Sequence, residues 1–559
     1  MKAKSTATNP KSGETKPKEF VLVRPWLWLM VVCLILYIPS LEFGFTELDD
    51  SIFIRELSAY NEDLSNLFTS FRRGVFHATN DTYYRPLFLD SIILNYQASE
   101  QDISGYRLVN IILHILSVVF LFRLLRTLNL SDITAFGLTL IFAVHPALTQ
   151  AVVWIPGRND TLMAVFIFPF LQQAILYARE GKIQQLLISA GCLLAAVFTK
   201  ETALLAPAVA FILLVVMLGK KWNERNLLIQ YGLWTATVSI FLLARSAASL
   251  KQQGLNPLQM LTDFMKRLPL VVQYLGKLIL PFNLSVFPIQ QDTVLYFGLV
   301  AIVLIIVLLL TAKEKNGRMI LGGVLIYFAF LLPALLVPRT LNEQAFEHRL
   351  YLPFAGILIV LSQSVLFRNK LSARTQVLLI AGIACLFAVL NYRHQQHFRD
   401  PLSFWQQAAR TSPHSAYALM MYGARHESKD TGYALMRRAY QLNPNEKYLN
   451  YYYGVMLQNQ DSVLESEKHF LKEQEISDYF ECDFYLAQID YKKGDKQNAQ
   501  RHLERYLTRD SMNAPANNNL LLLYLESGQG ANALQHIRNM QRRGLAVPPA
   551  LIQQAEGMR

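Results

Sequence analysis

The chain has 559 residues, of which 52% are hydrophobic and 17% charged, with a formal net charge of +12 and a mean hydropathy of +0.23. Repeated apolar stretches of about 20 residues exceed what a soluble core requires and predict a multi-pass membrane protein. The basic residues stand in short clusters between these stretches, without an aromatic-basic tract, so the charge reports topology and not a nucleic-acid partner.

Apolar stretches near 20 residues long predict eleven membrane crossings. They lie near residues 26–43, 106–125, 133–154, 160–178, 184–199, 202–219, 227–246, 292–311, 319–337, 350–367 and 374–391. A basic tail over residues 1–25 precedes the first crossing, and a basic cluster follows each even-numbered one. Because Lys and Arg mark cytoplasmic loops, the N-terminus is expected inside and the C-terminus outside.

Two outer loops are long, at about residues 44–105 and 247–291. In the first, residues 50–72 and 86–98 have apolar positions at helical spacing, which predicts helices that lie along the membrane interface. In the second, the segment QMLTDFMKRLPLVVQYLGKLILP is amphipathic at first and then apolar enough to dip into the bilayer.

From about residue 401 the long apolar stretches stop and short amphipathic helices recur. Two segments align with Gly494 above Gly528, Ala499 above Ala533 and Leu486 above Leu520, each pair 34 residues apart. This is the tetratricopeptide period, and with two looser copies before it the region 401–559 is predicted to form about four helical hairpins in an α-solenoid. Such stacks hold an extended peptide or a partner protein, or merely brace the domain beside them. The predicted fold class is therefore an all-α polytopic membrane domain over 26–400 followed by this solenoid.

Ionisable residues at the ends of membrane spans are costly to desolvate and are functional candidates. At the outer ends the sequence offers Asp49, Asp50, Arg85, Arg107, His145, Arg158, Asp160, Lys200, Glu201, Arg245, Glu347, His348 and Arg349. Glycosyl transfer from a polyprenyl-phosphate sugar would use such a set: a carboxylate takes the proton of the acceptor hydroxyl, and cations neutralise the departing phosphate. Arginine suits the phosphate because its planar guanidinium stays protonated and bonds in pairs.

Five motifs follow one another before the repeats: FTELDD, YYRPLFLDSIILNYQ with GYRLVNIILHIL, VHPALTQAVVWIPGRNDTLMAVF, FTKETALLAPAVAF and EHRLYLPFAGI. This order resembles the transmembrane and tetratricopeptide-repeat O-mannosyltransferases and their bacterial relatives of the GT-C superfamily. The resemblance covers about residues 26–400 and the repeat tail. It implies that the paired acidic motif is Asp49-Asp50, with Asp49 as the base and Asp50 as its partner.

The resemblance also assigns the other motif residues. Its YRP, GR, KE and ER-x-Y-x-P elements map to Arg85, Arg158, Lys200 with Glu201, and Arg349 with Tyr351. We predict donor phosphate binding by Arg85, Arg158 and Arg349 and, from its position at an outer span end, Arg245, with support from His145, Lys200, Glu201, Glu347 and Tyr351. Two positions depart from the usual pattern: Gln150 stands where relatives carry Glu, and His348 separates Glu347 from Arg349. These departures leave the sugar and the acceptor open.

Each candidate also has a purely structural interpretation. Asp49 and Asp50 would cap a helix that begins near Ser51, Lys200-Glu201 would be a local ion pair, and His145 would shape a helix end at the following proline. The arginines would extend to the interface without binding a ligand. No metal site is predicted, although two adjacent carboxylates leave Mg or Mn open.

Three functions stay open at this point. The first is an extracytoplasmic protein glycosyltransferase that takes a sugar from a polyprenyl phosphate and uses the repeats to present the acceptor protein. The second is a GT-C enzyme that acts on a lipid or glycan, and the third is a non-enzymatic membrane scaffold. The short repeat tail favours a bacterial inner membrane with periplasmic repeats, with the endoplasmic reticulum as the alternative.

Overall fold

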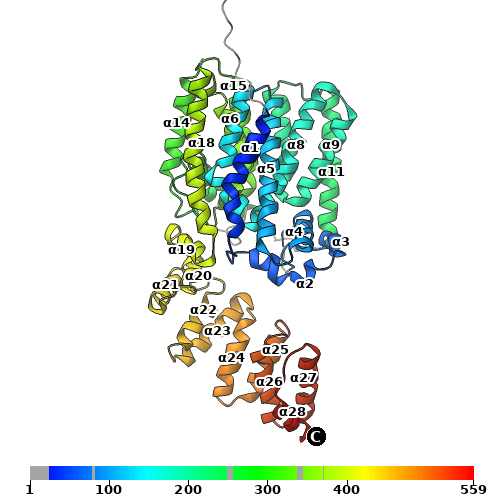
Figure 1. Ribbon diagram of the computed structural model, residues 1–559, viewed down its shortest axis with the longest axis vertical. Helices are drawn as coiled ribbons and strands as arrows, with labels where there is room; N and C mark the ends of the chain where they lie inside the picture. Colours follow the sequence, from blue (N-terminus) through cyan, green and yellow to red (C-terminus); the bar gives the residue numbers. More distant parts are fainter. Residues whose placement is uncertain (1–23, 78–81, 249–255, 337–343, 369–370, 559) are drawn as a thin grey trace, which may run out of the picture. The chain divides into compact units, whose positions relative to one another are not determined.

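The computed structural model describes residues 24–77, 82–248, 256–336, 344–368 and 371–558, so most of the predicted basic tail lies outside the described residues. The described residues form helices, and one isolated β-bridge joins Ile289 to Gln344 (Figure 1). Contacts divide the chain into two compact units. The membrane unit comprises Met1–Leu284, Val294–Asn342 and Glu347–Arg399, and the repeat unit comprises Ser285–Thr293, Glu343–Phe346 and Asp400–Arg559.

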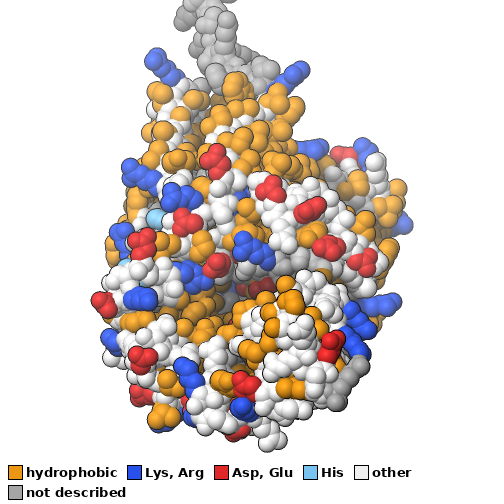
Figure 2. All heavy atoms as spheres, turned by 60° about the horizontal axis from the view of Figure 1, so that its bottom comes forward, with side chains coloured by type: hydrophobic (Ala, Val, Ile, Leu, Met, Phe, Trp, Pro, Cys, Tyr) orange, Lys and Arg blue, Asp and Glu red, His pale blue; other side chains and the backbone are white. Residues whose placement is uncertain are grey.

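Among the described residues, six helical segments are long and apolar enough to cross a membrane. They contain α1 (Pro25–Tyr37), α5 (Ile103–Thr127), α8 (Arg158–Glu180), α11 (Arg225–Ala247), α15 (Gly317–Leu336) and α18 (Ala373–Gln395). Large apolar side chains remain exposed on several of them, for example Ile35 and Leu243, each 71% exposed. Figure 2 shows hydrophobic side chains gathered over one part of the face that it draws, while charges of both signs dot the remainder. Such an apolar exterior suits a lipid environment.

The other five predicted crossings are helical over a shorter length. They contain α6 (Asp132–Val144) with α7 (Thr149–Val153), α9 (Ile183–Thr199), α10 (Ala206–Phe211) in the apolar run Glu201–Met217, α14 (Tyr296–Leu310), and α16 (Pro353–Leu361) followed by α17 (Val365–Arg368). The stretch predicted at 133–154 is bent by 54° at His145-Pro146, because a residue before proline is driven out of the helical region. The count of eleven crossings stays a prediction.

The two long outer loops both contain helices. In the first, α4 (Pro86–Ser99) matches the prediction, but residues 50–72 form four short pieces in place of one helix: Ile52–Glu56, α2 (Ser58–Asn61), α3 (Asn66–Thr69) and Ser70–Arg72. The interruption has a local cause, because Asp63 accepts hydrogen bonds from the backbone and hydroxyl of Ser65 and so competes with helix formation. The second loop holds α12 (Pro257–Arg267) and α13 (Pro269–Ile279).

The repeat unit is a succession of helical hairpins. Its helices are α19 (Pro401–Thr411), α20 (Ala416–Gly423), α21 (Lys429–Leu442), α22 (Leu449–Gln458), α23 (Val463–Ser477), α24 (Glu481–Lys492), α25 (Lys496–Leu507), α26 (Ala514–Glu526), α27 (Gly530–Arg542) and α28 (Pro549–Glu556). Gly494 and Gly528 occupy equivalent turns with φ of 82° and 68°, a conformation that favours glycine. Ala499 and Ala533 are both fully buried, as close packing at equivalent positions requires.

A histidine bond recurs with the same period. His469 bonds the Asn450 side chain and His502 the Asp483 side chain, each 19 residues back, and His536 bonds a backbone carbonyl at the same spacing. The hairpins are therefore alike in their polar contacts as well as in their small residues.

Candidate active site

The acidic loop between α1 and α2 is held at several backbone carbonyls. Arg107 of α5, which is 1% exposed, donates to the carbonyls of Phe43, at 3.3 Å, and Gly44. The indole of Trp154, just after α7, donates to the Leu48 carbonyl at 2.8 Å. Residues far apart in the sequence thus fix the path of the loop immediately before the two aspartates.

The two aspartates have different surroundings. Asp50 is fully buried, and its carboxylate accepts hydrogen bonds from the Thr46 backbone at 2.6 Å, the Thr46 hydroxyl at 2.9 Å and the Ser51 backbone at 3.0 Å. Asp49 is half-buried with φ of 64°, and among the described residues no donor hydrogen-bonds its carboxylate. Asp50 therefore stabilises the loop, whereas Asp49 offers an unused carboxylate and caps no helix.

The electrostatic surroundings of Asp49 favour a proton acceptor. Burial raises the pKa of Asp49 to about 7, with a further rise from the charge of Asp50 and a partial offset from Arg85. A carboxylate with a pKa near the working pH is suited to general-base chemistry.

Arg85 and Lys200 lie in this region as members of two ion pairs. The Arg85 Nε lies 2.9 Å from Glu201 Oε2, and Glu201 Oε1 also accepts the backbone N–H of Tyr84 at 3.0 Å. Lys200 Nζ donates to both oxygens of Asp160, at 2.7 and 2.8 Å. The adjacent Lys200 and Glu201 thus pair with distant residues and not with each other, so the local ion pair considered from the sequence is not what forms.

The turn Glu347–Leu350 brings a third cation. Gln150 Oε1 accepts the backbone N–H groups of Glu347, at 2.9 Å, and His348, at 3.1 Å, and lies 3.1 Å from His348 Nδ1. Burial lowers the pKa of His348 well below its usual range, and the charges of Lys200, Arg349 and Arg85 lower it further. His348 is therefore a neutral side chain around which three cations converge.

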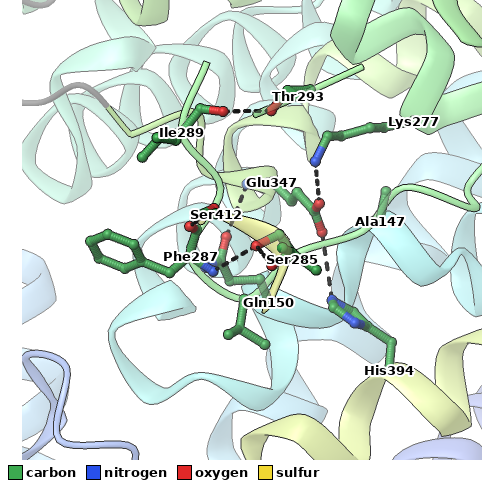
Figure 3. A network of polar contacts seen from close by, with 12 residues as sticks. Ala147, Gln150, Lys277, Ser285, Phe287, Ile289, Thr293, Glu347, His394 and Ser412 are labelled. Atoms are coloured by element: carbon green, nitrogen blue, oxygen red, sulfur yellow. Dashed lines mark hydrogen bonds and ion pairs between the residues drawn. The ribbon is translucent and has the colours of Figure 1, made fainter. Parts of the chain in front are cut away.

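A buried network of charged side chains holds the turn Glu347–Leu350 in place (Figure 3). Glu347 is fully buried, with its Oε1 2.6 Å from Lys277 Nζ of α13 and its Oε2 3.6 Å from His394 Nε2 of α18. Gln150, from α7, holds the other side of the turn. Sequence reasoning named Glu347 but missed Lys277 and His394, although a lysine within the apolar run of α13 was a readable signal.

Arg158 lies apart from this convergence of charges. It is fully buried and donates to Asn110 Oδ1 at 2.7 Å, Asn95 Oδ1 at 2.7 Å, the Ser91 carbonyl at 3.0 Å and the Tyr106 carbonyl at 2.9 Å. With these neutral acceptors around it and no exposed surface, Arg158 ties α4, α5 and α8 together and is not retained among the proposed phosphate ligands.

Three further candidates have internal partners. His145 is fully buried and bonds the Leu278 carbonyl through Nε2 at 2.9 Å, as a residue that shapes the break between α6 and α7. Tyr351 is fully buried, with its hydroxyl 2.7 Å from His114 Nδ1. Arg245 is half-buried and donates to a backbone carbonyl of the first outer loop at 3.2 Å. Of the three, Arg245 alone has a partly accessible side chain.

Metal ligation has no obvious set of residues here. Over the part of the chain that the structure describes, no group of three or more His, Cys, Asp or Glu side chains is arranged to hold a metal ion. Both oxygens of Asp50 already accept hydrogen bonds, so the adjacent carboxylates do not form a ready pair of ligands.

We compared the sequence with protein-family models and with known proteins. No family model matches the sequence. The chain is 24% identical over 427 residues to the protein O-mannosyl-transferase F38B6.6 of Caenorhabditis elegans, covering 72% of this chain and 60% of that protein. It is 36% identical over 126 residues to the Drosophila melanogaster protein O-mannosyl-transferase Tmtc1 (22% of this chain, 14% of that protein) and 38% over 98 residues to human TMTC3 (17% and 10%).

These similarities agree with the family resemblance of the five motifs. The relatives are named as protein O-mannosyl-transferases, and several helices of this chain are long and apolar enough to cross a membrane. The chain spans about three fifths of the worm protein's length and much less of the other two.

Proposed function

We propose that the chain is a membrane glycosyltransferase that transfers a sugar, with mannose as the first candidate, from a polyprenyl phosphate to a Ser or Thr hydroxyl of a protein. The observation that carries the proposal is Asp49: a half-buried carboxylate with a pKa near 7, to which no described residue donates a hydrogen bond and on which the charge of Arg85 acts. Arg85 acts in turn, with Lys200 and Arg349, on His348. The O-mannosyltransferase names of the relatives support the choice of reaction and sugar.

The proposed step is a single displacement at the anomeric carbon. The acceptor oxygen forms a bond to this carbon as Asp49 takes the hydroxyl proton, and the bond between the carbon and the phosphate oxygen breaks. The departing polyprenyl phosphate gains negative charge, which Arg349, Arg85 and Lys200 are placed to stabilise. Arg245, half-buried at the edge of the first outer loop, is proposed to contact the donor from the other side.

The proposed topology keeps eleven crossings with the acidic loop and the hairpins on the outer side. The hairpins are proposed to be a tetratricopeptide solenoid that presents the acceptor protein. A bacterial inner membrane with periplasmic repeats is the proposed location, with the endoplasmic reticulum as the alternative that the eukaryotic relatives support. A reporter fused after residue 400 should be active only outside the cytoplasm, and cytoplasmic activity would overturn this topology.

The test of the reaction is transfer from a polyprenyl-phosphate mannose to a Ser/Thr peptide by the purified protein. Asp49→Asn should lower turnover by about 10² to 10⁴ with near-normal donor affinity, as expected on loss of a general base. Asp63→Asn is a matched control, because Asp63 lies in the same outer loop and bonds only its neighbour Ser65. Full activity of Asp49→Asn would remove catalysis from this loop.

The same assay separates the alternatives. Transfer to a lipid or glycan but not to the peptide would favour the second function considered from the sequence, with the same donor chemistry. Absence of transfer from every donor, with donor binding also absent, would favour a scaffold.

A further inference from the structure

One stretch of the repeat unit has an unusual composition. Residues 443–485, which contain α22 and α23 and reach into α24, have nine Asp and Glu residues against three Lys, in a chain whose net charge is +12. The same stretch has six tyrosines and three phenylalanines. The hairpins that follow use aliphatic side chains such as Leu520 and Leu521 instead, so the general hairpin fold does not require these aromatics.

The tyrosines form a continuous face. The Tyr479 ring lies 4.8 Å from that of Tyr448 and 5.0 Å from that of Tyr451, and Tyr451 continues to Tyr485 at 5.8 Å. All four rings are half-buried, so part of each ring is open to a partner. Tyrosine with one buried edge and one accessible edge is typical of protein interaction surfaces.

A carboxylate stands among these rings. Burial raises the pKa values of Tyr451, Tyr479 and Tyr506, and the charge of Glu481 raises them further. Burial raises the pKa of Glu481 itself, with a further rise from the like charge of Asp510. The Tyr506 hydroxyl lies between the two carboxylates, 3.5 Å from Glu481 and 3.3 Å from Asp510.

Glu481 and Asp510 differ from two of their acidic neighbours in having no cation. Asp478 and Asp483 both pair with Arg505. In the described part of the chain no Lys or Arg forms an ion pair with Glu481 or Asp510. The tyrosine face therefore carries uncompensated negative charge.

A lysine already shows how a cation fits this face. The Lys447 ammonium lies 4.6 Å over the ring of Tyr448, at the edge of the face. Aromatic faces attract ammonium and guanidinium groups, and more strongly where a carboxylate is close.

We propose that the tyrosine face, defined by Tyr448, Tyr451, Tyr479 and Tyr485 around Glu481, binds an extended segment of the acceptor polypeptide that carries Lys or Arg. The tyrosine rings pack against the extended backbone and against the aliphatic part of the Lys or Arg side chain. The carboxylates of Glu481 and Asp510 pair with the positive charge of that side chain. The negative charge of the tyrosine face would repel an anionic lipid surface, so such a surface is not the proposed occupant. This inference rests on the proposed function for the identity of the acceptor, but not for the binding itself.

The test is binding of labelled peptides to the full-length protein by fluorescence anisotropy, without donor. A Ser/Thr peptide with three Lys or Arg residues is compared with a peptide of the same length in which Glu replaces them. The basic peptide should bind at least tenfold more tightly, and the preference should shrink as salt rises. Glu481→Gln should weaken the basic peptide about tenfold, as expected for loss of one charged hydrogen bond.

Two further variants keep the result interpretable. Glu481→Lys should lower affinity for the basic peptide and raise it for the acidic one, which a general loss of folding cannot do. Tyr491→Ala is the control, because Tyr491 lies on α24 together with Glu481 and is 46% exposed. Its hydroxyl bonds Glu526 and no residue of the tyrosine face. Equal affinity for both peptides, or an unchanged preference in Glu481→Lys, would overturn the proposal. Because no transfer is measured, an inactive enzyme that still prefers the basic peptide would contradict the proposed function and not this inference.

Discussion

The proposed base role of Asp49 predicts how the reaction rate depends on pH, in addition to the effect of Asp49→Asn on that rate. If Asp49 is the base, kcat/KM of the wild-type protein should rise about tenfold per pH unit up to a pH near 7 and then level off, because only the ionised carboxylate accepts the proton. The variant should have a low rate without this rise. Asn is tolerated at the left-handed φ of 64°, so the exchange should leave the loop unstrained.

The raised pKa of Asp49 also makes the free energy of unfolding depend on pH. An aspartate with a pKa of about 7 in the folded protein and about 3.9 unfolded contributes stability below pH 3.9 that is lost as the pH rises through 7. The full shift corresponds to about 4 kcal/mol, and partial solvent access to the half-buried side chain reduces this to about 1–2 kcal/mol. Asn cannot ionise, so the variant should be more stable than the wild type at pH 8.5 and nearly equal to it at about pH 3.5, below the unfolded pKa.

The assay is thermal unfolding of both proteins in the same detergent across this pH range, beside the kcat/KM profile. Asp63→Asn should show the opposite trend or none, since hydrogen bonds from Ser65 lower the pKa of Asp63. If the difference in melting temperature between wild type and Asp49→Asn does not change with pH, the carboxylate does not ionise near neutrality and the base assignment is wrong.

Three further substitutions test the surroundings of Asp49. Asp50→Asn should lower the free energy of unfolding by about 1–3 kcal/mol, because an amide would turn N–H groups towards the donors of Thr46; unchanged melting would contradict the anchoring role. Lys277→Met should cost about 3–5 kcal/mol by leaving buried Glu347 without its cation, and adding Glu347→Gln should recover much of this in the same unfolding assay. Arg349→Ala should weaken donor binding about ten- to a hundred-fold by calorimetry, and equal donor affinity would mean that another cation holds the phosphate.

Hydrophobic stretches predict the helices well because length and apolarity decide where a helix lies in a membrane. The His145-Pro146 pair predicted a helix end within 133–154, but the sequence could not show the bond from His145 to the Leu278 carbonyl of a distant loop, which holds the bent segment in place. Likewise the single helix predicted at 50–72 fails because a side-chain turn at Asp63 competes locally with an apolar pattern that is itself helical. Periodicity measures which face is apolar and carries no information about such polar competition.

The candidate site shows a similar limit. Residue type and position at the outer ends of the helices selected Asp49, Arg85, Lys200 and Arg349, but the same criterion also selected Arg158. What separates them is partners: Arg158 is enclosed by neutral acceptors from α4 and α5, which no local pattern around it reveals. A buried arginine that braces helices and a half-buried arginine that is proposed to bind phosphate are alike in sequence.

The ion pairs around the site explain how several cations can stay close together before a donor arrives. Arg85 and Lys200 would repel each other and Arg349, yet Glu201 and Asp160 offset two of these charges and fix the geometry of both side chains. A phosphate would then meet a preorganised set of donors and would not have to order flexible side chains, which lowers the entropic cost of binding. Burial and the charge of Asp50 raise the pKa of Asp49 to about 7 despite the nearby charge of Arg85. The proposed base and the proposed phosphate site can therefore coexist because the effects of burial and Asp50 on the pKa of Asp49 exceed the opposing effect of Arg85, whose own charge Glu201 offsets.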